Sequence, residues 1–141
     1  MGVCEKMNQL DRLCSLCPDE KILTGVCLDK YTTLRVGGPA DYFAEPENEG
    51  QLARLLAAAR EMGLPVLLMG NGSNLLVRDG GFRGLAVHIG RGFAEMKRTP
   101  AGLYAQAGAL LGTLARMAQE ESLTGLEFAQ GIPGTVGGAC I

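Results

Sequence analysis

The stretch from residue 65 to residue 77, Pro-Val-Leu-Leu-Met-Gly-Asn-Gly-Ser-Asn-Leu-Leu-Val, decides how the rest of this chain is arranged. Val66–Met69 is a short continuous apolar run, which is typical of a strand buried on both faces. It ends in the turn Gly70-Asn71-Gly72-Ser73-Asn74, whose two glycines allow positive φ and close approach to a ligand. Successive N–H groups in such a turn form an anion-binding concavity. Because the apolar run 75–77 follows at once, the pattern predicts a diphosphate-binding loop between two strands.

Two better-known phosphate-binding loops do not match this stretch. A P-loop requires a lysine after its last glycine, and no lysine lies between Lys30 and Lys97. The Rossmann fingerprint requires a third glycine that opens a helix, whereas Leu75 stands at that position and begins another apolar run. A tight turn without a ligand stays open as an alternative when this loop is considered by itself.

Length and composition indicate one globular domain. The chain has 141 residues, of which 47% are hydrophobic and 20% charged, which argues against disorder. Thirteen basic and fifteen acidic residues give a net charge of −2, so nucleic acid is not an expected partner. No apolar run reaches the ~20 residues that span a bilayer, and we expect a cytoplasmic protein without a membrane partner.

The five cysteines are expected to be reduced. Cys14 and Cys17 form a single Cys-x-x-Cys pair, and the only histidine of the chain, His88, is distant in sequence. We therefore predict that both are packing thiols on a helix face and that the chain has no metal site. His88 itself lies in an apolar run and is interpreted as a structural residue.

Hydrophobic periodicity predicts the main elements of secondary structure. Amphipathic spacing indicates helices over 3–17, 48–62 and 110–121, the second of them capped by Asn48 with Gln51 three residues later. Apolar and β-branched runs indicate an extended segment at 22–28 and strands at 31–36, 41–44, 66–69, 75–77, 85–89 and 103–107.

A second glycine-rich segment, 131–139, reads Gly-Ile-Pro-Gly-Thr-Val-Gly-Gly-Ala. Four glycines and a proline in nine residues predict a loop without regular secondary structure, in which the main chain can lie flat against a ligand. Two such loops in one small chain are best explained by one large ligand that both contact.

Four sequence blocks together resemble one enzyme family. They are 31–41 (Tyr-Thr-Thr-Leu-Arg-Val-Gly-Gly-Pro-Ala-Asp), 70–77 (Gly-Asn-Gly-Ser-Asn-Leu-Leu-Val), 125–128 (Gly-Leu-Glu-Phe) and 131–139. In this order they resemble the UDP-N-acetylenolpyruvoylglucosamine reductases (UDP-N-acetylmuramate dehydrogenases) of peptidoglycan synthesis. The resemblance covers residues 22–141.

The resemblance implies an α+β fold, namely an FAD-binding domain of the vanillyl-alcohol-oxidase (PCMH) type, truncated in its second subdomain. Residues 1–21 would form an N-terminal helical segment and 22–141 the FAD-binding domain, incomplete at its C-terminus and lacking the substrate domain. In the family, NADPH reduces the flavin, and the flavin reduces the enolpyruvyl group of a nucleotide sugar. No obligate protein partner is implied.

The resemblance also assigns residues to the cofactor. The first loop would hold the FAD diphosphate through its N–H groups, the second would lie against the flavin side and the diphosphate, and the 33–38 turn would lie near the cofactor. The expected cofactor-binding residues are Gly70, Asn71, Gly72, Ser73, Asn74, Leu75, Gly131, Ile132, Pro133, Gly134, Thr135, Gly137, Gly138 and Ala139.

The family's catalytic arginine, serine and glutamate have no counterparts here, because the resemblance places them beyond Ile141. No residue of this chain is therefore assigned to acid–base catalysis, and we expect the 141 residues alone to be inactive. Two alternatives stay open: an FAD-linked oxidase of the same fold, which the Tyr31–Asp41 block disfavours, and a non-catalytic nucleotide-binding or interaction module.

Overall fold

A mixed four-stranded sheet is the centre of the first unit of the fold, in a computed structural model that describes residues 3–141, with side chains from residue 8 onward. The strand order is β1-β2-β4-β3, with β1 antiparallel to β2 and with β2 and β3 both parallel to β4. The bounds are Ile22–Cys27 for β1, Pro39–Ala44 for β2, Val66–Met69 for β3 and Phe82–His88 for β4. Of the predicted N-terminal segment 1–21, residues 1 and 2 lie outside the described residues.

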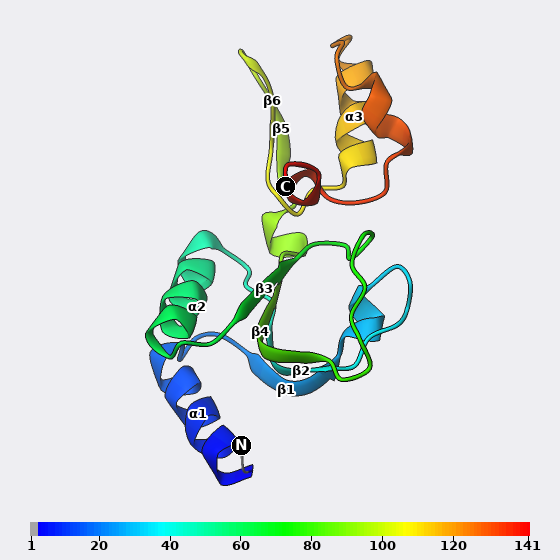
Figure 1. Cartoon of the computed structure of the whole chain (residues 1–141). Coiled ribbons are helices and arrows are strands. Elements are labelled where there is room, and N and C mark those ends of the chain that lie inside the picture. Colours follow the sequence, from blue (N-terminus) through cyan, green and yellow to red (C-terminus); the bar gives the residue numbers. More distant parts are fainter. Residues whose placement is uncertain (1–2) are drawn as a thin grey trace.

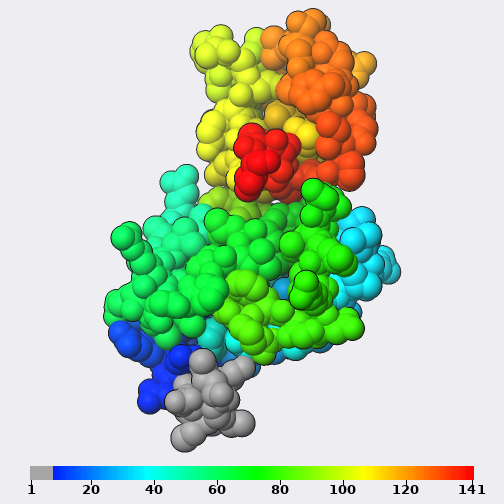
Figure 2. Space-filling model, in the orientation of Figure 1, coloured from blue at the N-terminus to red at the C-terminus, as the bar shows by residue number. Residues whose placement is uncertain are grey.

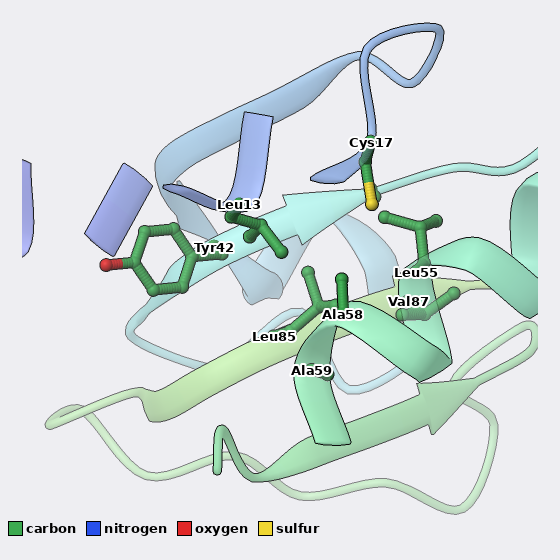
Figure 3. Close-up of a cluster of buried hydrophobic side chains, with 9 residues drawn as sticks. Leu13, Cys17, Tyr42, Leu55, Ala58, Ala59, Leu85 and Val87 are labelled. Atoms are coloured by element: carbon green, nitrogen blue, oxygen red, sulfur yellow. The ribbon is translucent and has the colours of Figure 1, made fainter. Parts of the chain in front are cut away.

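Two helices cover one side of this sheet (Figure 1). They are α1, Val3–Leu16, and α2, Glu49–Glu61. Leu13 and Cys17 from the N-terminal segment and Leu55 from α2 pack against the sheet residues Tyr42 and Leu85 (Figure 3). Both predicted helices are confirmed to within a residue or two at their ends.

The predicted cap of α2 is also confirmed. Oδ1 of Asn48 accepts a hydrogen bond of 3.0 Å from the main-chain N–H of Gln51. The reciprocal bond of a capping box is displaced by one residue, since Oε1 of Gln51 accepts from the N–H of Glu47 at 2.7 Å. Asn48 therefore fixes where the helix begins.

The opposite side of the sheet is covered by irregular segments and by the short 3-10 helix η1, Leu28–Tyr31 (Figure 1). The hydrophobic cluster on this side of the sheet contains Leu28, Phe43, Met69, Val77 and Ala86. The register pairs the bulky Phe43 with the small Ala86 across β2 and β4, so the two side chains fit one layer. Leu85, Ala86 and Val87 are fully buried, so β4 is covered on both faces, as is the neighbouring β2.

A hairpin and α3, Leu111–Glu120, form the second unit. The hairpin consists of β5, Met96–Thr99, and β6, Gly102–Ala105. The 3-10 helix η2, Arg91–Phe93, precedes it; η3, Glu127–Gly131, and α4, Val136–Ala139, follow α3. In Figure 2 the C-terminal residues (red) lie where the two units meet. Strand β5 was missed from sequence, because its Met-Lys-Arg-Thr composition lacks an apolar run.

The prediction of a strand over 31–36 is wrong. Residues 32–38 form a loop held by the buried hydroxyl of Thr32, which donates to the carbonyl oxygen of Val36 at 3.0 Å. Arg35 has φ 52°, a left-handed conformation that interrupts a strand. A local side-chain hydrogen bond therefore outweighs the β propensity of this segment.

Three details of the glycine-rich segments also differ from expectation. Val66–Met69 is a strand, but it lies at the sheet edge with Leu68 50% exposed, rather than being buried on both faces. Residues 75–77 pair with no strand among residues 3–141, since Val77 packs into the irregular layer and Leu76 is exposed. The segment 131–139 contains the one-turn helix α4, because the hydroxyl of Thr135 caps it by accepting from the N–H of Gly138.

The two thiols of the Cys-x-x-Cys pair differ from each other. Cys17 is buried in the core, as predicted, and burial, followed by the nearby Glu20 carboxylate, raises its pKa. Cys14 is exposed, so the prediction of a packing role is wrong for it. In the described residues 3–141 we find no helix with both the length and the apolar character that crossing a bilayer demands.

Candidate functional site

The carboxyl ends of the three mutually parallel strands β2, β3 and β4 lie side by side at one end of the sheet. Glu45 follows the last residue of β2, Gly70 follows the last residue of β3, and His88 is the last residue of β4. The register confirms that the ends are adjacent, since Ala44 pairs with Val87 and Met69 pairs with His88. In open sheets with parallel strands, ligands bind outside the carboxyl ends. Here the carboxyl ends of these strands face the second unit (Figure 1).

The loop 70–75 presents unpaired main-chain donors at the carboxyl ends of these strands. Among the described residues, its N–H groups donate to no main-chain or side-chain acceptor. Of the main-chain carbonyl oxygens of this loop, only that of Gly72 is engaged among the described residues, accepting from the N–H of Thr33 at 3.1 Å. Consecutive free N–H groups in a turn favour an anion, so this loop keeps the property predicted from its sequence.

Gly72 has a structural role beyond the one predicted. Its φ is 59°, as expected for a glycine in this turn. A Cβ here would stand 2.1 Å from the carbonyl oxygen of Tyr31, so the close approach that requires glycine is to the chain itself. Gly72 therefore lets the loop pack directly against the backbone of Tyr31 and Thr32.

The two glycine-rich loops are in direct contact, as one shared ligand would require. A Cβ on Gly70 would lie 2.5 Å from the hydroxyl oxygen of Thr135. The hydroxyl of Ser73 donates to the carbonyl oxygen of Pro133 at 3.2 Å, and a Cβ on Gly134 would meet that hydroxyl at 3.0 Å. The structure thus joins segments about 60 residues apart in sequence.

The second loop is held by the segment between β6 and α3. Its N–H groups at Val136 and Gly137 donate to the carbonyl oxygens of Ala109 and Ala107, both at 2.8 Å. The absence of a side chain at Gly137 allows this, because a Cβ there would stand 2.8 Å from Cβ of Ala107. Within the described part of the loop after η3, the N–H groups of Gly134 and Thr135 remain without an acceptor.

Two open cavities lie on either side of Asn71 and His88. The first, of about 800 Å³, lies between the units and includes Asn71, His88, Thr135 and the charged side chains Glu45, Glu47 and Arg91 in its lining. The second, of about 790 Å³, lies over η1 and the 32–35 turn. Each falls within the volume range of small-molecule and cofactor sites, ~300–1,000 Å³. Because both include Asn71 and His88, the two cavities adjoin at these residues, and we refer to them together as the cleft.

The second cavity contains an unpaired polar atom and a perturbed phenol. Oδ1 of Asp29 is buried and has no hydrogen-bond partner among the described residues. Burial, followed by the Glu45 carboxylate, raises the pKa of Tyr31, so this phenol stays neutral through the physiological range. The lining of this cavity also includes Lys30 and Arg35, whose positive charges would attract a phosphate.

The predicted site residues divide into three groups. Asn71 and Thr135 line the first cavity, and the free N–H groups belong to Gly70–Leu75, Gly134 and Thr135. The side chain of Leu75 packs into the layer over β2 and β4, away from the cleft. Gly131, Ile132 and Pro133 are exposed at the loop surface, and Gly138 and Ala139 are exposed in α4.

Sequence reasoning missed Glu45, His88 and the charged residues of both cavities. Glu45 and His88 are 43 residues apart, and neither belongs to a motif. The signal that would have found them is their position at the carboxyl ends of strands that lie side by side. That signal requires the strand order, which the local pattern does not contain.

The residues present fit an extended dinucleotide. The free N–H groups of 70–75, Gly134 and Thr135 suit a diphosphate. Asn71 of the first loop lines both cavities, so a ligand held at these donors has space in each of them.

Comparison with known proteins bears on this site. A family model for the FAD binding domain matches residues 40–141. The chain belongs to this FAD-binding family. The match includes β2 except its first residue, β3, β4, both glycine-rich loops and the whole second unit.

Curated relatives carry the name that the four sequence blocks suggested. The chain is 45% identical to the UDP-N-acetylenolpyruvoylglucosamine reductase of Agathobacter rectalis, across 88% of this chain and 43% of that protein. It is 40% identical to the enzyme of the same name from Clostridioides difficile, across 94% and 45%. The predicted family resemblance is confirmed. The chain spans less than half the length of these relatives.

Solved structures confirm the predicted fold class. The UDP-N-acetylenolpyruvylglucosamine reductase of Thermus caldophilus superposes with a TM-score of 0.67 at 37% identity, over 85% of this chain and 41% of that one. A BBE-like protein of Physcomitrella patens superposes with a TM-score of 0.56 at 20% identity, over 80% and 26%, and shows the fold alone.

Proposed function

We propose that the cleft binds FAD in an extended conformation, with the diphosphate at the contact between the two glycine-rich loops. The observation that carries this proposal is the set of free N–H groups at Gly70–Leu75, joined at Gly70 and Thr135 to two more on the second loop. Membership of the FAD-binding family supports FAD over other dinucleotides. When bound, FAD would supply hydride transfer, and the chain would supply binding and orientation.

The individual residues have different tasks in this proposal. The loop amides and Thr135 hold the diphosphate. Lys30 and Arg35 add positive charge on the side of the second cavity. Gly72 and Gly137 keep the two loops at the correct distance by permitting close packing against Tyr31 and Ala107.

For the whole protein to which such a domain belongs, we propose the activity named in its relatives. It would reduce the enolpyruvyl group of a UDP-N-acetylglucosamine derivative in the cytoplasm with NADPH as co-substrate, in peptidoglycan synthesis. The identities of 45% and 40% to reductases of that name support this proposal. No side chain of the 141 residues is assigned to proton transfer, and the chain by itself is expected to be inactive.

Introducing a negative charge beside the proposed diphosphate tests FAD binding. Asn71→Asp puts a carboxylate at the junction of the two cavities, beside the proposed diphosphate. Two unit charges 4 Å apart repel by about 1 kcal/mol in water and about 4 kcal/mol at an effective dielectric constant of 20, so FAD affinity should fall about tenfold or more. Flavin fluorescence quenching on titration of the chain measures the dissociation constant.

The matched control is Asn8→Asp, the same change at an exposed position on α1. It should bind FAD as the unaltered chain does. Equal affinity in Asn71→Asp and Asn8→Asp would contradict the proposed diphosphate position. Absence of FAD binding by the unaltered chain would contradict the proposed function itself.

Inactivity of the isolated chain is tested by NADPH oxidation in the presence of FAD and UDP-N-acetylenolpyruvoylglucosamine. Hydride transfer needs the two reacting atoms held in position, and the enolate needs a charge-stabilising group and a proton donor. We expect no turnover above the free-flavin background. Substrate-dependent turnover would mean that catalytic residues lie within residues 1–141.

A further inference from the structure

His88 stands where the two cavities join. It lines both cavities together with Asn71, and it is the last residue of β4, between the ends of β2 and β3. A group at this junction would touch Asn71 of the glycine-rich loop on one side and His88 on the other. By the proposed function, on which this inference rests, that group is the diphosphate.

The imidazole ring is held in one orientation. Nδ1 of His88 lies 2.6 Å from Oε1 of Glu45. The ring also packs edge-on against Tyr31 at a centroid distance of 5.1 Å and stacks with Phe43 at 6.4 Å. A Cβ on Gly90 would stand 3.2 Å from Cε1, so the backbone of that glycine closes the side of the ring. His88 is therefore a positioned side chain.

The contact with Glu45 determines which nitrogen faces the cleft. An ionised carboxylate only accepts hydrogen bonds, so Nδ1 carries a proton and donates it to Glu45. Nε2 has no partner among the described residues and is not among their buried unpaired atoms, so it is open to the cleft. With a second proton the ring would present a charged N–H donor at that position.

The charged side chains that line the two cavities around the ring are of both signs. Glu45 and Glu47 in the first cavity and Asp29 in the second would repel a diphosphate, while Arg91, Lys30 and Arg35 would attract it. Tyr31 faces the ring from η1 and stays neutral, since burial, followed by Glu45, raises its pKa. A proton on His88 would offset the Glu45 carboxylate at the point nearest the anion.

We propose that His88 is an additional cofactor-binding residue: Glu45 orients its ring, and the protonated Nε2–H donates to the FAD diphosphate. FAD binding then takes up a proton at His88. Because the protonated state becomes less populated as pH rises, FAD affinity falls with increasing pH across the range in which histidines titrate. The sign would be opposite if binding released a proton.

The chain has one histidine, so its ring resonances are assigned without ambiguity. At pH 7.5, added FAD should move the Cε1–H resonance of the unaltered chain toward the imidazolium position. Riboflavin, which has the same ring system without the diphosphate, should not move it. Movement away from the imidazolium position, or none while FAD is bound, would overturn the proposal.

The second measurement is the pH dependence of FAD affinity in His88→Gln, which keeps an amide donor but cannot gain a proton. The dissociation constant of the unaltered chain should rise by about tenfold from pH 6 to pH 9, whereas that of His88→Gln should change by less than about twofold. Lys97→Gln removes a cation on the hairpin outside both cavities and should retain the tenfold rise.

The outcomes separate this inference from the function on which it rests. FAD binding with the same pH dependence in His88→Gln as in the unaltered chain would overturn the role of His88 and leave FAD binding intact. No FAD binding at any pH would overturn the proposed function. If His88→Gln proved too unstable to assay, the resonance shift in the unaltered chain would still decide the question.

Discussion

Replacing Gly70 by alanine tests the contact between the two glycine-rich loops. Gly70 is not among the positive-φ glycines, so alanine is compatible with its backbone conformation. The added methyl group would stand 2.5 Å from the hydroxyl oxygen and 3.3 Å from the methyl carbon of Thr135. The first distance is shorter than real contacts of Cβ atoms, so one loop must move.

The expected cost follows from this overlap. Overpacking of one or more methylene equivalents costs about 1–3 kcal/mol. Thr135→Ala removes both clashing atoms and also the cap of α4, where Oγ1 accepts from the N–H of Gly138 at 3.3 Å; losing such a cap costs about 0.5–2 kcal/mol. In the double variant the clash is absent, so its loss of stability should be smaller than the sum of the single losses by about 1–2 kcal/mol.

Urea unfolding of the four proteins measures this coupling, and Gly80→Ala is the matched control. A Cβ on Gly80 meets no atom within 4 Å and its φ is not positive, so it reports only the entropic effect of alanine on the unfolded chain. Distant sites add within about 0.3–0.5 kcal/mol. Additivity of Gly70→Ala and Thr135→Ala within that margin would refute the contact between the loops.

Three further predictions concern stability and thiol chemistry. Asn48→Ala should lower the unfolding free energy by about 1 kcal/mol, because α2 loses its 3.0 Å cap; an unchanged melting temperature would contradict this. Leu85→Ala, at a fully buried position of β4, should cost about 2–5 kcal/mol, whereas Leu76→Ala at a 69% exposed position should stay within about 0.5 kcal/mol; equal losses in denaturant titrations would contradict the assignment of the core. At pH 8, Cys17 should react with a thiol reagent more slowly than the exposed Cys14, Cys27 and Cys140, because it is buried and its raised pKa lowers the thiolate fraction. Peptide mass mapping measures the four rates, and equal rates would contradict this prediction.

Helix α2 and the family were predictable because their signals are local. The periodicity of 48–62 and the Asn48–Gln51 spacing specify a capped helix by themselves. The two glycine-rich loops were predicted to share a ligand, and their contact at Gly70 and Thr135 is consistent with that expectation. The FAD positions themselves remain predictions.

The errors arose where tertiary contacts decide the local structure. The pattern of Tyr31–Val36 favours a strand, but the buried Thr32 hydroxyl and the left-handed Arg35 make a loop. The apolar runs 66–69 and 85–89 look alike, and only the strand order places the first at the edge and the second at the centre. Glu45 and His88 escaped notice for the same reason.

The strand order also has a thermodynamic consequence. The cleft exists only when β2, β3 and β4 are all in register, because each contributes one end to it. A ligand held there binds the folded chain and not the unfolded one, and at a concentration of 100 times its dissociation constant it adds about 2.7 kcal/mol to the unfolding free energy. Saturation with FAD should therefore slow amide hydrogen exchange across the whole sheet, including the N–H groups of Leu85 and Val87, whose side chains pack against the helices.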